Sequence, residues 1–360
     1  MKTPKSILKK LNERKEADSF RSLFIAPKGI DFYSNDYLGI ARLQGSESGK
    51  HGSTGSRLIS GNSAYTEKLE SVYSTFFNTD TATLYNSGYD ANLGLLSCLP
   101  QRGDTIIYDE LSHASIRDGI QLSFAKSYNF RHNDLDHLVE RLKNATGEVY
   151  VLIETVYSMD GDQAFLKGIA TCCKEYGAFL IVDEAHSCGV FGDQGNGLVS
   201  ALELDNLVFA KVITFGKAFG SHGAMVLGSK DLKDYLVNFS RAFIYTTALP
   251  PSSLKRLSFA LAQVMQADEA RANLNANIAC FQELAHKRGI EILDSDTAIQ
   301  GIIIPSNKAV KQKAKQLNEQ GFLVKAILSP TVATGQERIR ICLHNYNTQK
   351  EIQSLIEALI

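Results

Sequence analysis

The sequence predicts an α/β fold, in which a large domain with a mostly parallel sheet sandwiched by helices is followed by a smaller α+β C-terminal domain. In the middle of the chain, short runs that are apolar throughout alternate with helical patterns, which is typical of a parallel sheet buried on both faces. Near residue 250 the alternation gives way to long helical patterns and then to shorter elements. The length of 360 residues also exceeds what one simple core usually holds, so two domains are expected.

The individual elements follow from the same patterns. We expect strands at 104–108, 149–153, 179–183, 211–215 and 224–228, with helices between them such as 165–176. Residues 250–289 predict long helix with few interruptions, and the last helix should begin with a capping box formed by Thr348 and Glu351. With a boundary near 235–250, the predicted parts are an N-terminal arm and helix (1–30), a large domain (31–240) and a small domain (241–360).

Composition and charge exclude several classes of protein. The net charge is −1 and charged residues make up 21 %, so no basic surplus indicates nucleic acid as a partner. No apolar run reaches 18 residues, so no transmembrane helix is expected, and the basic N-terminal stretch lacks the apolar core of a signal peptide. The six cysteines form no C-x-x-C pair, which favours reduced thiols in a cytoplasmic protein and no metal site.

Polar residues follow several of the predicted strands directly. Asp183 and His186 come after one strand, Ser158 after another, and Lys217 after a third. Because the carboxyl ends of parallel strands line the ligand crevice of an open sheet, these side chains are expected to converge on one pocket.

The residue types in that pocket favour pyridoxal 5′-phosphate (PLP). A buried lysine has a lowered pKa, which suits Schiff-base chemistry, and a carboxylate can pair with a pyridinium nitrogen. Thr214 and the glycine-rich stretch 216–223 can offer a hydroxyl and backbone N–H groups to a phosphate, and His113 can stack on a flat ring. Taken singly, Lys217 is more simply a solvated loop residue and Asp183 a helix N-cap. Together these residues favour the cofactor site.

Nine motifs in register along nearly the whole chain resemble those of the α-oxoamine synthases, which are PLP-dependent transferases of fold type I. The motifs are SNDYLG (34–39), STGSRLISGN (53–62), NSGYDANLG (86–94), SHASIRDG (112–119), YSMDGD (157–162), VDEAHSCGVFGDQGNG (182–197), TFGKAFG (214–220), IYTTALPP (244–251) and TVATGQERIR (331–340).

This resemblance implies the residues that hold the cofactor ring. Lys217 would form the Schiff base with PLP, and Asp183 would keep the pyridine nitrogen protonated. His186 would bond the phenolic oxygen, with Ser158 nearby, and His113 would stack on the ring.

The resemblance also implies how the phosphate would be bound. Gly88 and Tyr89, with Thr214, would contact the phosphate region. Thr246 and Thr247 would reach a phosphate across a subunit interface, which implies a homodimer with shared active sites.

Substrate residues are implied in the same way. Asn35 and Arg340 would bind the amino acid carboxylate, and Thr331 would contact substrate. Residues 14–23 look like the family's N-terminal arm, with Arg21 as its substrate-contacting arginine. The partners are then small molecules, namely an amino acid and an acyl-CoA or acyl carrier protein thioester.

The implied reaction is a decarboxylative condensation of an amino acid with an acyl thioester. GYDANLG and YSMDGD favour the branch that condenses alanine with a pimeloyl thioester in biotin synthesis. Glycine C-acetyltransferase and serine C-palmitoyltransferase are the alternatives within the family. A PLP aminotransferase and a non-catalytic PLP fold are the alternatives of another class.

Two segments depart from the family pattern. Residues 41–51 are short and rich in Gly and Ser, where relatives carry a longer helical segment. Leu328-Ser329 stands where the biotin enzyme usually has Arg-Pro, which favours an uncharged acyl chain. Arg21 and Arg117 remain as counterions for a charged chain, and Arg117 is more simply a solvated surface residue.

Overall fold

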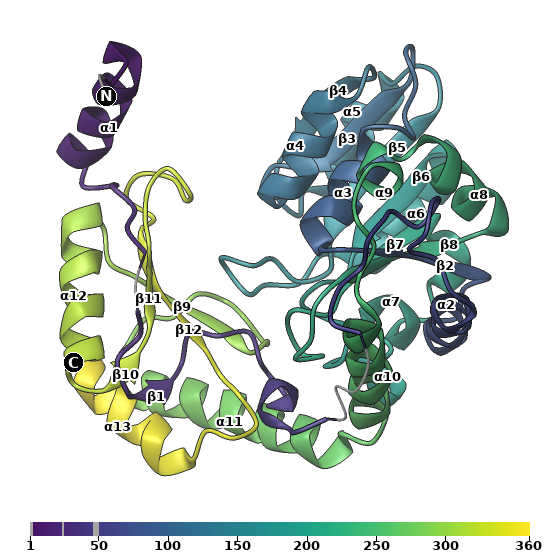
Figure 1. Cartoon of the computed structure of the whole chain (residues 1–360). Helices are drawn as coiled ribbons and strands as arrows, with labels where there is room; N and C mark the ends of the chain where they lie inside the picture. Colours follow the sequence, from purple (N-terminus) through teal and green to yellow (C-terminus); the bar gives the residue numbers. More distant parts are fainter. Residues whose placement is uncertain (1–2, 24, 46–49) are drawn as a thin grey trace. The chain divides into compact units, whose positions relative to one another are not determined.

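A computed structural model describes residues 3–23, 25–45 and 50–360 of the chain (Figure 1). Its contacts separate two compact units. The large unit comprises Leu38–Tyr157 and Gln163–Arg271, and the terminal unit comprises Met1–Tyr37, Ser158–Asp162 and Ala272–Ile360. These units are defined by contacts and do not test the predicted domain limits of 1–30, 31–240 and 241–360, which stay a prediction.

A seven-stranded sheet with the order β2-β8-β7-β6-β5-β3-β4 forms the centre of the large unit. All five predicted strands are present, to within one residue at each end, and the sheet also contains β2 and β4. The strands are β2 (Thr81–Tyr85), β3 (Thr105–Asp109), β4 (Lys126–Phe130), β5 (Val149–Glu154), β6 (Phe179–Asp183), β7 (Ala210–Thr214) and β8 (Ala224–Gly228).

One strand is the exception in the mostly parallel sheet that the sequence predicts. β8 runs antiparallel to both β2 and β7, whereas β3 to β7 pair in parallel. The physical reason is the short connection: residues 215–223 are too few for the crossover that a parallel neighbour requires. The chain therefore turns back directly after β7, and this turn contains Lys217.

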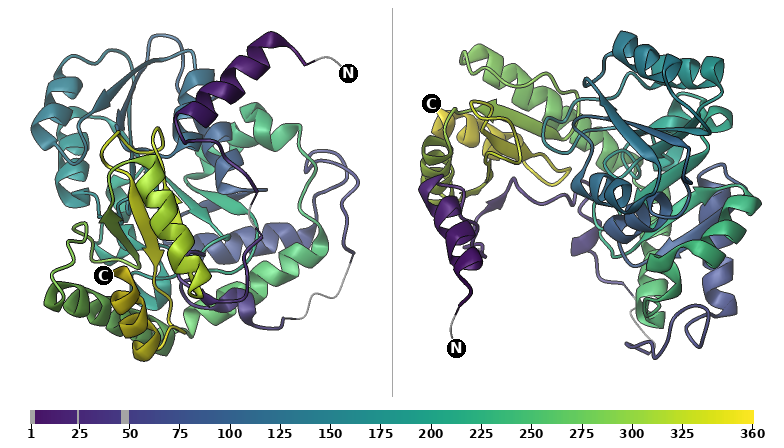
Figure 2. Two further views of the ribbon diagram at one scale, coloured as in Figure 1. Left: turned by 90° about the vertical axis from the view of Figure 1, so that its left-hand side faces the viewer. Right: turned by 90° about the horizontal axis from the view of Figure 1, so that it is seen from above.

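Successive residues of the central strands point into two different cores. Ile106, Leu152 and Ile181 pack with α3, α4, α8 and α9, whereas the neighbouring Ile107 and Val182 pack with α5, α6 and α7. Helices thus cover both faces of the sheet (Figure 2). The helices and 3-10 turns are η1 (Ile40–Arg42), α2 (Ala64–Phe76), α3 (Gly88–Leu96), α4 (Ala114–Leu122), α5 (Leu135–Lys143), α6 (Leu166–Tyr176), η2 (Asp193–Gly195), α7 (Leu198–Ala201), η3 (Asp205–Leu207), α8 (Lys230–Phe239), α9 (Arg241–Ile244) and α10 (Pro251–Met265).

The terminal unit has an antiparallel sheet of order β11-β12-β9 and a parallel pair, β1 with β10. The capping box of Thr348 and Glu351 is present at the start of α13, and the long helical stretch 250–289 is broken between α10 and α11. The elements are α1 (Lys5–Glu16), β1 (Ile30–Asp31), α11 (Asp268–Lys287, which begins in the large unit), β9 (Ile299–Ile303), α12 (Asn307–Glu319), β10 (Phe322–Leu323), β11 (Lys325–Ile327), β12 (Arg338–Cys342) and α13 (Gln349–Leu359).

Two further expectations concern the N-terminal part of the chain. The N-terminal amphipathic helix forms α1, and its apolar residues Ile7, Leu8 and Leu11 are exposed. The segment 41–51 begins in η1, but its residues 46–49 lie outside the described residues. In the part of the chain that the structure describes, no helix is both long enough and apolar enough to cross a membrane.

Candidate active site

Asp183 is the last residue of β6 and is almost fully buried in the large unit. Its two carboxylate oxygens have separate donors: Oδ2 accepts a hydrogen bond of 2.8 Å from Asn92 Nδ2, and Oδ1 accepts one of 2.9 Å from the backbone N–H of Ala185. The strand end therefore presents an anchored carboxylate, as a pyridinium partner requires.

His113 precedes α4 and is bound at both its backbone and its ring. Its backbone N–H donates to Glu154 Oε1 at 2.5 Å, and its Nδ1 lies 2.8 Å from Ser115 Oγ. Desolvation lowers the pKa of His113, although the Asp183 carboxylate acts in the opposite direction. The His113 side chain is exposed, so its ring is accessible for stacking.

Glu154, the last residue of β5, pairs in register with Asp183 on the neighbouring strand. Two carboxyl groups therefore lie side by side at the strand ends. Burial raises the pKa of Glu154 to about 8, with the Asp183 charge acting in the same direction and the Lys217 charge opposing it. Glu154 is therefore protonated at neutral pH.

Lys217 lies in the turn between β7 and β8, and the turn is anchored on both sides of it. Phe215 and Phe219 are fully buried and pack edge to face, with ring centroids 5.4 Å apart. Gly220 has a positive φ of 52°, and a Cβ there would lie 2.1 Å from the backbone N of Ala41, so no other residue fits. The two phenylalanines and the glycine hold the backbone, and the lysine side chain is half-buried.

The N-terminus of α3 forms the candidate phosphate site. Gly88 is its first residue, and a Cβ there would lie 3.4 Å from the side chain of Thr214, so the helix start and the end of β7 are in close contact. Free backbone N–H groups at a helix start and a nearby hydroxyl suit a phosphate. Asn86, two residues before the start of α3, donates from Nδ2 to Thr246 Oγ1 at 2.9 Å and to the carbonyl of Thr247 at 3.0 Å. These bonds attach the segment of Thr246 and Thr247 to the chain just before α3.

The large unit thus fits PLP on the evidence of its own donors and acceptors. It contains the anchored Asp183 carboxylate, Lys217, the exposed ring of His113, and the start of α3 beside the Thr214 hydroxyl. His186 is buried in the turn after β6, and Tyr89 Oη donates to Asp118. Among the described residues, no group of three or more His, Cys, Asp or Glu side chains could hold a metal ion.

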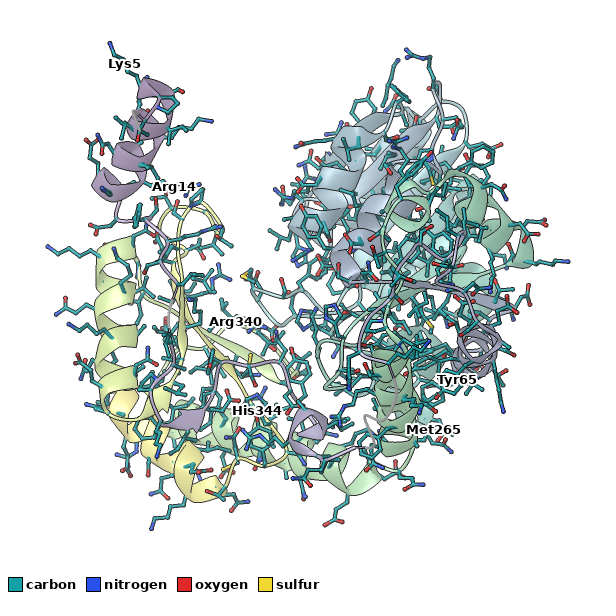
Figure 3. All side chains as sticks on the ribbon, viewed as in Figure 1. Lys5, Arg14, Tyr65, Met265, Arg340 and His344 are labelled. Atoms are coloured by element: carbon teal, nitrogen blue, oxygen red, sulfur yellow. The ribbon has the colours of Figure 1, made fainter. Side chains whose placement is uncertain are left out.

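The terminal unit contains a second group of predicted residues, centred on Arg340 of β12 (Figure 3). The Arg340 guanidinium is buried and donates to the Ser158 carbonyl at 2.7 Å, to Asn35 Oδ1 at 3.0 Å and to Cys342 Sγ at 2.8 Å. Burial acts to lower the pKa of Arg340, but Cys342 and Tyr37 raise it overall, so the group stays charged. A guanidinium fixed in this way suits bidentate binding of a carboxylate.

Arg21 and Thr331 also come together in the terminal unit. Arg21 Nη2 donates to Thr331 Oγ1 at 3.2 Å, and both side chains are exposed. A cation therefore lies beside the loop in which Leu328-Ser329 lacks one. Ser158 belongs to this unit, whereas His186, its expected neighbour, belongs to the large unit.

Sequence reasoning missed three residues of the large unit: Asn92, Ser115 and Glu154. Each lies within or directly beside a motif that was recognised, Asn92 in NSGYDANLG, Ser115 in SHASIRDG and Glu154 at the end of a predicted strand. The residue types of Asn92 and Ser115 gave no signal, because an Asn or Ser within a helix is usually a local hydrogen-bonding residue.

The fold and site define a PLP-dependent transferase of fold type I, as solved structures show. A serine palmitoyltransferase from S. paucimobilis with bound PLP–myriocin aldimine matches with a TM-score of 0.89 at 26 % identity, over 99 % of this chain and 96 % of that one. An 8-amino-7-oxononanoate synthase from Francisella tularensis matches with a TM-score of 0.81 at 32 % identity, over 92 % and 96 % of the two chains.

The sequence comparisons then give the family. Residues 27–359 match the family "Aminotransferase class I and II", and the chain belongs to it. An 8-amino-7-oxononanoate synthase from Emericella nidulans is 38 % identical, covering 98 % of this chain and 94 % of the relative. The expectations of fold type I, of PLP as cofactor and of an acyltransferase of the α-oxoamine synthase type are therefore confirmed.

Proposed function

We propose that the protein condenses L-alanine with a pimeloyl thioester and releases 8-amino-7-oxononanoate, carbon dioxide and a thiol, as a step of biotin biosynthesis. The observation that carries the proposal is the near full-length identity of 38 % with the Emericella nidulans 8-amino-7-oxononanoate synthase. The geometry supports the reaction class, because the large unit combines an anchored carboxylate with a lysine held in a rigid turn.

When bound, PLP supplies the electron sink that stabilises negative charge at the Cα of the amino acid. Asp183 would keep a proton on the ring nitrogen, His186 would face the phenolic oxygen and His113 would stack on the ring. Lys217, as the free amine, would remove the Cα proton of the substrate as a general base. All four side chains belong to the large unit.

Other predicted residues would bind the phosphate of the cofactor and the carboxylate of the amino acid. The backbone of Gly88 and Tyr89 and the hydroxyl of Thr214 would hold the phosphate. Arg340 would bind the amino acid carboxylate, because its three hydrogen bonds fix the plane of the guanidinium and Asn35 lies against it.

The identity of the acyl chain raises a second candidate function. Leu328-Ser329 carries no charge, which favours an uncharged chain and a reaction like that of serine palmitoyltransferase. Arg21, however, bonds to Thr331 in the same loop and can serve the distal carboxylate of a pimeloyl chain. This contact favours the dicarboxylic substrate.

A homodimer with shared active sites is part of the same proposal. Leu58, Ile59 and Tyr245 are apolar, and Ile59 is 85 % and Tyr245 72 % exposed. They belong to the STGSRLISGN and IYTTALPP motifs, which are joined by a hydrogen bond from the Ala248 backbone N–H to the Gly55 carbonyl. Exposed apolar side chains gathered in this way indicate an interface. Sedimentation or light scattering of the holoenzyme tests this, and a monomer with full activity would contradict it.

The test of the substrate measures thiol release by holoenzyme given L-alanine, glycine or L-serine with pimeloyl-, acetyl- or palmitoyl-CoA. We expect release with L-alanine and pimeloyl-CoA. Arg21→Ala should raise KM for pimeloyl-CoA roughly tenfold, which corresponds to the loss of one charge-assisted hydrogen bond. Arg117→Ala is the matched control, because Arg117 donates to the backbone carbonyls of Ser112 and Glu110. Activity confined to serine with palmitoyl-CoA, or to glycine with acetyl-CoA, would contradict the proposal.

A further inference from the structure

A continuous chain of hydrogen bonds joins Asp183 to His113 inside the large unit. Asn92 Nδ2 donates to Asp183 Oδ2 at 2.8 Å and to Ser115 Oγ at 3.0 Å. Ser115 Oγ lies 2.8 Å from His113 Nδ1. Asn92 and Ser115 are 3 % and 1 % exposed, so water cannot replace these bonds. The two residues that would contact opposite parts of the cofactor ring are therefore physically connected.

The direction of each hydrogen bond follows from its partners. Asp183 Oδ2 accepts its hydrogen bond from Asn92, so the Asn92 amide turns its NH₂ group toward it. The backbone N–H of Ser115 donates to His113 Nδ1 at 3.2 Å, so Nδ1 is an acceptor. The Ser115 hydroxyl, which accepts from Asn92, therefore donates to the same Nδ1. Nε2 carries the proton of His113, and the lowered pKa of His113 keeps its ring neutral.

The packing of α3 against α4 makes the link possible. At Gly119 of α4, a Cβ would lie 3.0 Å from the Asn92 carbonyl oxygen and 2.9 Å from Leu96 Cβ. Only glycine allows the helices to approach so closely, and this approach brings Asn92 within reach of Ser115. Asn92 also lies one helical turn after Gly88, so one helix presents both the phosphate site and the amide.

We propose that Asn92 is a positioning residue of the active site, which through Ser115 links the Asp183 carboxylate to the Nε2-protonated ring of His113. This inference rests on the proposed function, since the partner of Asp183 would be the PLP ring nitrogen. Asn92 contacts neither cofactor nor substrate in this scheme. Its two N–H groups hold the Asp183 carboxylate in place and polarise the hydroxyl that fixes the histidine.

The first test compares the affinity of apoenzyme for PLP and for 1-deazapyridoxal phosphate, in which C–H replaces the ring nitrogen. Asn92→Leu has nearly the same size and loses both donors. It should weaken PLP binding about tenfold, the cost of about one charge-assisted hydrogen bond, and leave binding of the analogue unchanged. Asn277→Leu is the matched control, because Asn277 is equally buried and its Nδ2 donates to two backbone carbonyls in the terminal unit.

The second test reads the histidine directly and needs no cofactor. In ¹⁵N-histidine-labelled apoenzyme, with the His113 signals identified by their loss in His113→Gln, Nε2 should carry the proton. Ser115→Ala keeps the backbone N–H that holds Nδ1 as an acceptor but removes the hydroxyl donor, so the ¹⁵N signal of His113 Nδ1 should shift toward that of a less strongly hydrogen-bonded nitrogen. Ser115→Thr, which keeps the hydroxyl, should restore the wild-type signal. These readouts would not respond to a purely structural role.

The inference is overturned if Asn92→Leu binds both cofactors like wild type, or weakens both equally as Asn277→Leu does. It is also overturned if Ser115→Ala leaves the ¹⁵N signal of His113 Nδ1 unchanged. Failure of the proposed function would look different, because the wild-type enzyme would then release no thiol from pimeloyl-CoA while the affinity difference and the tautomer persisted.

Discussion

Glu154→Gln should change the pH dependence of stability in a direction that the structure fixes. Burial, with a smaller contribution from the Asp183 charge, raises the pKa of Glu154 from its usual 4.5 to about 8. The native protein then keeps a proton that the unfolded chain releases above about pH 4.5. The stability from this proton is fully present below that pH and is lost as the pH rises through about 8.

The size of the effect follows from the same linkage. Between the two pKa values the free energy of unfolding falls by about 1.4 kcal/mol per pH unit, or about 2.7 kcal/mol from about pH 5.5 to about pH 7.5. Glutamine cannot titrate, and its amide oxygen can still accept the backbone N–H of His113. Glu154→Gln should therefore become more stable relative to wild type by up to this amount across the window.

The assay is thermal unfolding of wild-type and variant apoenzyme across that pH range, together with infrared spectroscopy. A protonated carboxylic acid has a C=O band that a carboxylate lacks, and at neutral pH this band should be weaker in Glu154→Gln than in wild type; burial also raises the pKa of Glu184, so the comparison rests on the difference between the two spectra. Glu70→Gln is a control, because Arg57 and Lys233 overcome the effect of burial and lower the pKa of Glu70. It should be destabilised by a constant amount across the window. A constant difference in stability between Glu154→Gln and wild type, with no change in the band, would refute the reasoning.

Two further predictions concern buried charges. Asp205→Asn should lower the free energy of unfolding by about 3 kcal/mol in urea denaturation, because it leaves the buried Lys211 ammonium without its counterion, which lies 2.6 Å away. The double variant with Lys211→Met should recover most of the loss, and no recovery would contradict this account. Arg340→Lys should raise KM for the amino acid at least about tenfold while the visible absorbance of the holoenzyme stays, because an ammonium lacks the planar fork with which a guanidinium held by Asn35 and the Ser158 carbonyl can bind a carboxylate bidentately. An unchanged KM in steady-state kinetics would contradict it.

Much of the large unit could be predicted because its central strands are buried on both faces. Their continuous apolar runs are visible in the sequence, and the polar residues that end them, such as Asp183, are equally visible. β4 was missed because it is an edge strand in which only Phe130 is buried, and β2 was missed because threonines interrupt it. The direction of β8 depends on the length of the preceding turn rather than on its own residues.

The residues of the candidate site also fall into those that the sequence predicts and those that it does not. Lys217 and Asp183 follow strand ends, so strand periodicity predicts their positions. Asn92 and Ser115 meet only because Gly119 lets two helices approach closely, and no local pattern encodes such a contact. The raised pKa of Glu154 likewise depends on burial that arises only when the sheet and its helices are assembled.

The most direct test of the central claim is to identify the lysine that holds the cofactor. Reduction of the holoenzyme with borohydride fixes PLP to that lysine, and mass spectrometry of the digested protein locates it. The structure predicts the adduct on Lys217, in the turn anchored by Phe215 and Phe219, with no adduct in Lys217→Ala. An adduct on Lys211, six residues away on the buried face of β7, or on any other lysine would contradict the assignment of the active site.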